Sequence, residues 1–124
     1  MNNAYLIEFE KFTDERGSLI SFEYNKNCPF EIQRCFFIYD IPSFISRGGH
    51  TNTKSKNILV AVNGSCKIKI IYNNKENVFV LNSPNIGLFI DKNVYREMYE
   101  FNNNCVLLCI NNKKYNIKEY IKGQ

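Results

Sequence analysis

The only histidine of the chain, His50, lies in the segment RGGHTN (residues 47–52), which is the part of the sequence best suited to chemistry. An imidazole exchanges protons near neutral pH, so one well-placed histidine can act as an acid or a base. Alternate residues of a strand point to the same face, so His50 and Asn52 would form a polar pair on one side of a sheet. On the spacing alone, a surface loop with an incidental histidine is an equally good interpretation.

A metal centre built on His50 is not favoured. Zinc and the transition metals prefer several imidazole or thiolate ligands. The chain has one His, and its five Cys show no CxxC spacing and no cluster near His50. We therefore predict a site with no metal and no cofactor. The sequence also lacks a P-loop, a dinucleotide-binding fingerprint and a Ser-His-Asp signature.

Four arginines could bind an anionic ligand. Arg34 lies in an apolar run, where a buried guanidinium needs an ion-pair partner or a ligand. Arg47 precedes the histidine segment and suits a phosphate, which a guanidinium binds through two parallel donors. Arg16 lies in a turn, and Arg96 lies in a late apolar run where it could reach a sugar. For each arginine, a structural salt bridge is an equally good interpretation of the residues alone.

These residues are carried by short apolar runs that turn residues interrupt. The runs predict strands at residues 5–9, 18–24, 32–41, 57–62, 65–72, 78–81, 86–90, 95–101 and 105–110. Asn63-Gly64 between two runs predicts a hairpin. The tail at 115–121 predicts a short helix or one more strand. Turns at intervals of roughly 8–12 residues favour an all-β sandwich or barrel.

Length and composition limit the class of protein. A chain of 124 residues with 44% hydrophobic content predicts one domain, spanning residues 1–124. The net charge of +4 comes with scattered lysines, which indicates a solvated surface and no nucleic-acid partner. No apolar run approaches the roughly 20 residues of a membrane span, and no signal peptide is evident. An odd number of cysteines without pairing motifs predicts reduced thiols and a cytoplasmic protein.

Six segments, in order, resemble motifs of the dTDP-sugar 3,4-ketoisomerases. The segment RGGHTN resembles the first cupin motif and stands where that family has R-G-x-H-A-H. The others are DERGSL (14–19), PFEIQR (29–34), Leu59 with VNGSC (62–66), PNIGL (84–88) and YREMYEF (95–101). Together they cover residues 14 to 101. The resemblance implies an all-β cupin, an antiparallel β-barrel or jelly roll.

The resemblance also implies a function. It predicts an isomerase that converts dTDP-4-keto-6-deoxyglucose to the 3-keto sugar, for 3-amino sugars of surface polysaccharides such as O-antigen or S-layer glycans. It implies a homodimer, and a dTDP-linked 4-keto-6-deoxyhexose as the substrate. His50 and position 52 become the catalytic candidates. The substrate-binding candidates are Arg16, Arg34, Arg47, Asn57, Tyr95 and Arg96.

Two positions depart from the family pattern. Tyr95 replaces a tryptophan, and Asn52 replaces the family's second histidine, a leading candidate for proton transfer. An amide cannot exchange protons at neutral pH. Either the chain is a natural variant that relies on His50, or it has lost the activity, or an introduced His-to-Asn change traps a ligand. A non-catalytic sugar-nucleotide-binding cupin and a 3,5-epimerase-like enzyme are the competing functions.

Overall fold

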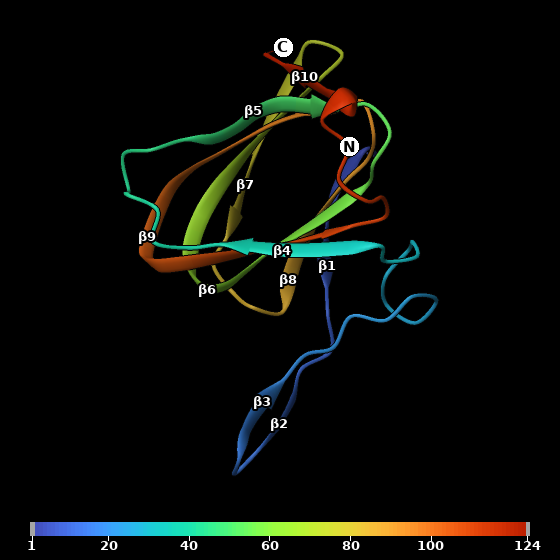
Figure 1. Ribbon diagram of the computed structural model, residues 1–124. Coiled ribbons are helices and arrows are strands. Elements are labelled where there is room, and N and C mark those ends of the chain that lie inside the picture. Colours follow the sequence, from blue (N-terminus) through green and yellow to red (C-terminus); the bar gives the residue numbers. More distant parts are fainter. Residues whose placement is uncertain (1, 124) are drawn as a thin grey trace.

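The computed structural model describes residues 2–123, which fold almost entirely into β-strands (Figure 1). In chain order the elements are β1 (Ala4–Glu8), β2 (Phe12–Asp14), β3 (Gly17–Leu19), β4 (Arg34–Ile38), β5 (Arg47–Asn52), β6 (Asn57–Tyr72), β7 (Lys75–Leu81), β8 (Ile86–Ile90), β9 (Tyr95–Asn111), the 3₁₀ helix η1 (Ile117–Glu119) and β10 (Tyr120–Lys122). No helix among the described residues is long enough to cross a membrane.

Two long antiparallel strands, β6 and β9, organise the fold. The first half of β6 pairs with β8 and with the second half of β9, whose other neighbour is β4. The second half of β6 pairs with β7 and with the first half of β9, whose other neighbour is β5. The two halves therefore form two sheets, ordered β1-β8-β6-β9-β4 and β7-β6-β9-β5-β10.

This arrangement is the predicted cupin jelly roll. The path of hydrogen-bonded strands ends at β1 and at β10, so the sheets enclose a space without closing into a complete barrel.

The bend between the two halves occurs where the sequence analysis predicted breaks. The pairing of β6 with β9 shifts register between Ala61 and Lys67. Gly64 has a φ of +68°, and a Cβ atom there would lie 2.7 Å from the backbone oxygen of Asn103. The predicted hairpin at Asn63-Gly64 is therefore wrong, because the glycine permits close strand contact within one bent strand. The expected break between residues 101 and 105 is likewise a bend within β9.

The other expected elements differ mainly in their limits. The hairpin that joins β6 to β7 turns at Asn73 and Asn74, whose φ values of 51° and 61° suit a type I′ turn. The strand expected at 18–24 is confined to β3, and the one expected at 32–41 to β4. The tail contains both structures expected for it, because η1 runs directly into β10.

Apolar side chains pack in two clusters. The larger lies between the sheets and includes Leu59, Ile68, Leu88 and Leu107, all fully buried. The smaller joins Phe9 and Phe30 to outward-facing residues of the first sheet. The first cluster supports the floor of the space between the sheets, and the second anchors the chain that leads to and from β2 and β3.

The hairpin of β2 and β3 extends away from the sheets (Figure 1). All of its strand residues are exposed, and its strands pair only with each other within residues 2–123. It is the one part of the described chain that does not contribute to the cavity or to either core cluster.

Candidate functional site

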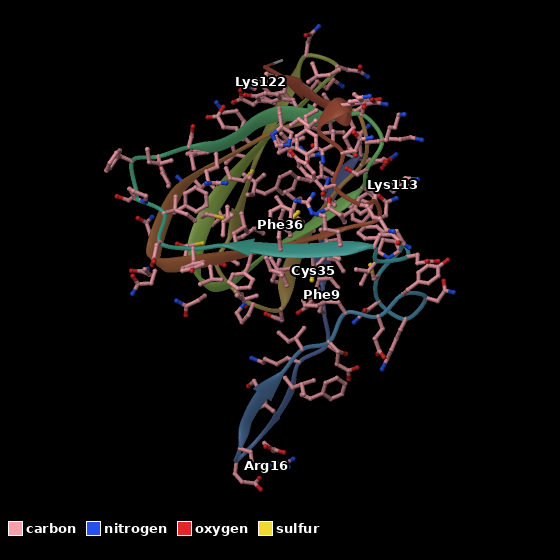
Figure 2. All side chains as sticks on the ribbon, viewed as in Figure 1. Phe9, Arg16, Cys35, Phe36, Lys113 and Lys122 are labelled. Carbon is pink, nitrogen blue, oxygen red and sulfur yellow. The ribbon has the colours of Figure 1, made fainter. Side chains whose placement is uncertain are left out.

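A cavity of about 390 Å³ lies between the two sheets. One wall comes from β4, from the start of β6 and from the end of β9; the other comes from β5, from the start of β9 and from β10. Figure 2 shows Phe36 and Cys35 on opposite sides of β4, with Phe36 toward the cavity. The bends in β6 and β9 bring these two walls together.

His50 stands on β5 directly opposite Arg96 of β9. Its ring stacks on Tyr120, with 4.8 Å between ring centroids and 29° between planes. Burial, followed by the positive charge of Arg96, lowers the pKa of His50 from its usual value of 6.5. His50 is therefore neutral at pH 7, which is the state that a general base requires.

Two buried amides face the same cavity with unused hydrogen-bonding groups. Asn52 and Asn57 are 3% and 1% exposed. Asn52 Oδ1 and Asn57 Nδ2 have no hydrogen-bond partner within residues 2–123. Buried polar atoms are nearly always satisfied, so an acceptor and a donor left unpaired beside a cavity indicate places for a polar ligand.

Arg96 is a buried cation without a close carboxylate. Its guanidinium donates to the backbone oxygen of Val94 at 3.3 Å, and no acidic side chain of the described residues lies within salt-bridge distance. Burial lowers its pKa to about 10, so it remains charged at neutral pH. A buried and incompletely paired cation next to His50 suits an anionic oxygen of a ligand.

Aromatic rings hold a second cation at the cavity. The Arg34 guanidinium lies 4.5 Å from the centre of the Phe36 ring and 4.9 Å from that of Tyr115. Such stacking fixes the orientation of a planar guanidinium and leaves its edges free to donate. Arg34 is therefore placed to bind a phosphate or a sugar oxygen.

Six of the eight residues singled out by the sequence line this cavity: Arg34, Arg47, His50, Asn52, Asn57 and Arg96. Tyr95 is absent from the lining, and its hydroxyl is 3.1 Å from Glu97 Oε2. Arg16 lies near the tip of the β2–β3 hairpin, where it pairs with Asp14 at 2.6 Å (Figure 2). In one chain, therefore, neither Tyr95 nor Arg16 reaches the cavity, and their binding roles stay predictions.

Sequence reasoning missed the contribution of the C-terminal segment. Tyr115 and Tyr120 line the cavity, and Glu119 is buried behind it. These residues lie outside the recognised motifs, and only the pairing of β10 with β5 brings them to His50. No group of three or more His, Cys, Asp or Glu side chains is placed to hold a metal ion in the described chain. The metal-free site stays a prediction.

Comparisons with known proteins match this geometry to a family. The family model described as "WxcM-like, C-terminal" (FdtA) matches residues 2–124. The TDP-4-oxo-6-deoxy-α-D-glucose-3,4-oxoisomerase of Aneurinibacillus thermoaerophilus is 37% identical over 117 residues, which are 94% of this chain and 84% of that protein.

Solved structures agree. A 3,4-ketoisomerase of Thermoanaerobacterium thermosaccharolyticum has a TM-score of 0.95 and 34% identity, over 99% of this chain and 89% of that one. That structure is a His-to-Asn variant in complex with TDP-4-keto-6-deoxyglucose. A dTDP-sugar 3,5-epimerase of Legionella pneumophila has a TM-score of 0.82 at 12% identity, over 98% of this chain and 73% of that one, and so shares the fold alone. The chain belongs to the WxcM-like family of sugar 3,4-ketoisomerases.

Proposed function

We propose that this protein isomerises TDP-4-keto-6-deoxyglucose to its 3-keto isomer, with His50 as the base. The observation that carries the proposal is that His50, neutral at pH 7, lies in the cavity beside the buried cation Arg96. Relatives that carry this activity by name match nearly the whole chain, and one of them binds that sugar nucleotide.

The reaction moves a carbonyl group from C4 to C3 of the sugar. A base removes the proton from C3, which the neighbouring C4 ketone makes acidic, and an enediolate forms. A proton is then added at C4, the hydroxyl proton leaves O3, and O4 gains a proton, so that no proton is consumed overall. His50 can take the first proton and return it at C4, because an imidazole near its pKa does both.

The cavity also offers groups that can stabilise the enediolate. Negative charge develops on O4 when the C3 proton leaves, and preorganised donors in a site that excludes water stabilise such charge best. Arg96 supplies a fixed positive charge, and Asn57 Nδ2 supplies a donor without a partner. Arg34 and Arg47, on β4 and β5, are the candidates for the diphosphate.

Asn52 limits the expected rate. The amide can hold a sugar hydroxyl, but it cannot take or give a proton at neutral pH. We therefore propose that the chain binds the sugar nucleotide well and turns it over slowly. A pocket that has lost one acid–base group also favours the alternative of a non-catalytic sugar-nucleotide-binding protein, and turnover decides between the two.

The decisive experiment follows freshly made dTDP-4-keto-6-deoxyglucose by NMR with three proteins. We expect slow conversion by the native chain, and less by His50→Asn. We expect Asn52→His to raise turnover toward the roughly 10²–10⁴-fold that a placed acid–base group contributes. No conversion by the native chain or by Asn52→His, with dTDP still bound, would favour the non-catalytic alternative. Full native activity unchanged by Asn52→His would show that His50 alone suffices.

Ligand binding is tested separately from turnover. Binding of dTDP to the folded state should raise the melting temperature in a saturable way, equivalent to roughly 2.7 kcal/mol at a hundred times Kd. Arg34→Met keeps the length of the side chain and removes its charge, so it serves as the matched binding-deficient control. The absence of any shift at millimolar dTDP in folded protein would contradict the proposal.

We propose a homodimer as the working form. Phe12 and Leu19 on the β2–β3 hairpin are 49% and 60% exposed, which is costly for a hairpin with no core of its own. A second chain that covers this hairpin would bury both residues, and it would give Arg16 a route to a ligand that its own chain does not offer. Light scattering should give twice the mass of one chain, and a monomer at micromolar concentration would refute the dimer.

The proposed setting follows from the resemblance. A 3-keto product supplies an aminotransferase, so the pathway would yield 3-amino sugars for lipopolysaccharide, O-antigen or S-layer glycans in the cytoplasm. We also propose that the protein works without a metal or cofactor. Elemental analysis of the purified protein should find no stoichiometric zinc, iron, manganese or nickel, and one tightly bound equivalent would refute this.

A further inference from the structure

A buried polar chain connects the C-terminal segment to the catalytic strand. Asn52 Nδ2 donates to Ser55 Oγ at 2.8 Å, and Ser55 Oγ lies 2.5 Å from Glu119 Oε1. All three residues are at most 5% exposed. The proposed mechanism uses neither Ser55 nor Glu119, although burial of a carboxylate is costly unless its hydrogen bonds are worth that cost.

The directions of these hydrogen bonds are determined by chemistry. A carboxylate only accepts, so Ser55 must give its single hydroxyl proton to Glu119. The Ser55 oxygen is then left to accept, and the group facing it from Asn52 must be the NH₂ end of the amide. Consequently, the other end of the amide, Oδ1, is turned away from Ser55 and is free of partners within the described residues.

Oδ1 is thereby available to the His50 ring. Burial and then the charge of Arg96 lower the pKa of His50, and the Gly48 carbonyl, the Asn52 side chain and Glu119 act in the opposite direction. Arg96 on β9 and Glu119 with Tyr120 on the C-terminal segment are the titratable groups around the ring. Arg34, Arg47, Cys109 and Tyr115 line the same cavity.

The carboxylate is held firmly enough to perform such a role. The backbone oxygen of Glu119 accepts from Thr53 N at 3.0 Å and from Thr53 Oγ1 at 2.9 Å. Its side chain also accepts from the backbone N–H of Ser55 at 3.1 Å. Glu119 therefore clamps the turn that follows β5 at both ends, and the turn carries the serine that orients Asn52.

We propose that Ser55 and Glu119 are positioning residues that hold the Asn52 amide with its oxygen toward His50, and so give the base a fixed hydrogen-bond acceptor. The inference rests on the proposed function for its catalytic meaning. Without the clamp, the amide can rotate and present its NH₂ group, which would replace an acceptor by a donor beside the ring.

The test uses the fact that His50 is the only histidine. In untagged protein, one ring signal in a ¹H–¹³C spectrum reports its titration without assignment. We expect Ser55→Ala and Glu119→Ala each to lower the pKa of His50 by roughly half to one unit. Glu119→Gln keeps an acceptor oxygen toward Ser55 and should lower it less. Glu76→Gln, on exposed β7, removes the same charge far from the cavity and should leave it unchanged.

The outcomes separate positioning from simple charge. An unchanged pKa in both Ser55→Ala and Glu119→Ala would overturn the proposal, and so would an effect of Glu119→Gln with none of Ser55→Ala. If neither alanine variant folds, nuclear Overhauser contacts in the native chain decide. Contacts from the Asn52 amide protons to Ser55 Hβ support the clamp, and contacts from those protons to the His50 ring refute it.

The titration does not depend on turnover, so the two proposals can fail independently. Loss of sugar isomerisation with the expected shift would refute the function and leave the clamp standing. In an active protein, the low-pH limit of kcat/KM should move with the pKa of His50 in each variant. An active Ser55→Ala variant with an unmoved limb would count against the positioning role.

Discussion

The cavity and the β2–β3 hairpin differ in how their polar groups are held. In the cavity, His50, Asn52 and Arg96 are held by residues far away in the sequence, on strands that meet only in the fold. In the hairpin, Arg16 bonds to Asp14 two residues away, and both side chains are largely exposed. A recognised motif thus occurs in both regions, but only the cavity converts its motif into an enclosed site.

The comparison teaches that exposure decides what a motif can do in one chain. Around the cavity, burial shifts the pKa values of His50 and Arg96 and leaves two amide groups without partners. At the hairpin, water screens the ion pair and supplies its remaining hydrogen bonds. The hairpin can therefore act on a ligand only after another surface covers it.

The largest contrast is expected from glycine substitution. Gly64→Ala places a methyl group against the backbone of β9 at a φ of +68°, so we expect a loss of about 2–6 kcal/mol. The matched control Gly17→Ala also has a positive φ but meets nothing within 4 Å, and it should cost about 1–2 kcal/mol. Urea unfolding measures both. Equal losses would show that the bend in β6 does not depend on close strand contact.

Leucine truncation is expected to give the next contrast. Leu88 is fully buried between the sheets, and Leu88→Ala should cost about 2–5 kcal/mol of unfolding free energy. Leu19 on the hairpin is 60% exposed, and Leu19→Ala should cost about 0.5 kcal/mol or less when the dilute chain is unfolded in urea. If Leu19→Ala also weakens self-association in light scattering, the hairpin belongs to the proposed dimer contact.

A smaller effect is expected from pH. The pKa of His50 is lower in the folded chain than its usual 6.5, so the unfolded chain takes up this proton first. The free energy of unfolding should therefore fall as pH drops from 6.5 toward the folded pKa, with no further loss from this group below it. His50→Asn should lack that component in paired urea titrations. Identical pH curves for the two proteins would show that burial does not disfavour the charged ring.

The smallest effect on the isolated chain is expected at Arg16. Its pairing with Asp14 is exposed, so Arg16→Ala should leave the melting temperature unchanged. If Arg16 reaches the ligand from a partner chain, the variant should still lose dTDP affinity. Mixed dimers of Arg16→Ala and His50→Asn should then recover one intact site and part of the activity. No recovery in verified mixed dimers would exclude a shared site.

Much of the fold was predictable from local patterns. Turn residues separate apolar runs along nearly the whole chain, and this predicted an all-β jelly roll, in which the strand at residues 86–90 is confirmed as β8. The same local signals failed at Asn63-Gly64. A glycine with positive φ serves a hairpin turn and a bend under close strand contact equally well, and only the neighbouring β9 distinguishes them.

The sequence by itself determined which residue can move protons, because it contains a single histidine and places an asparagine two residues further along the same strand face. Only the tertiary structure decided how that histidine behaves. Its lowered pKa arises from burial and from Arg96 across the sheet, and its acceptor network comes from Glu119, which no motif marked. Periodicity reports the face on which a residue lies, whereas proton affinity depends on charges and partners that folding brings from distant parts of the chain.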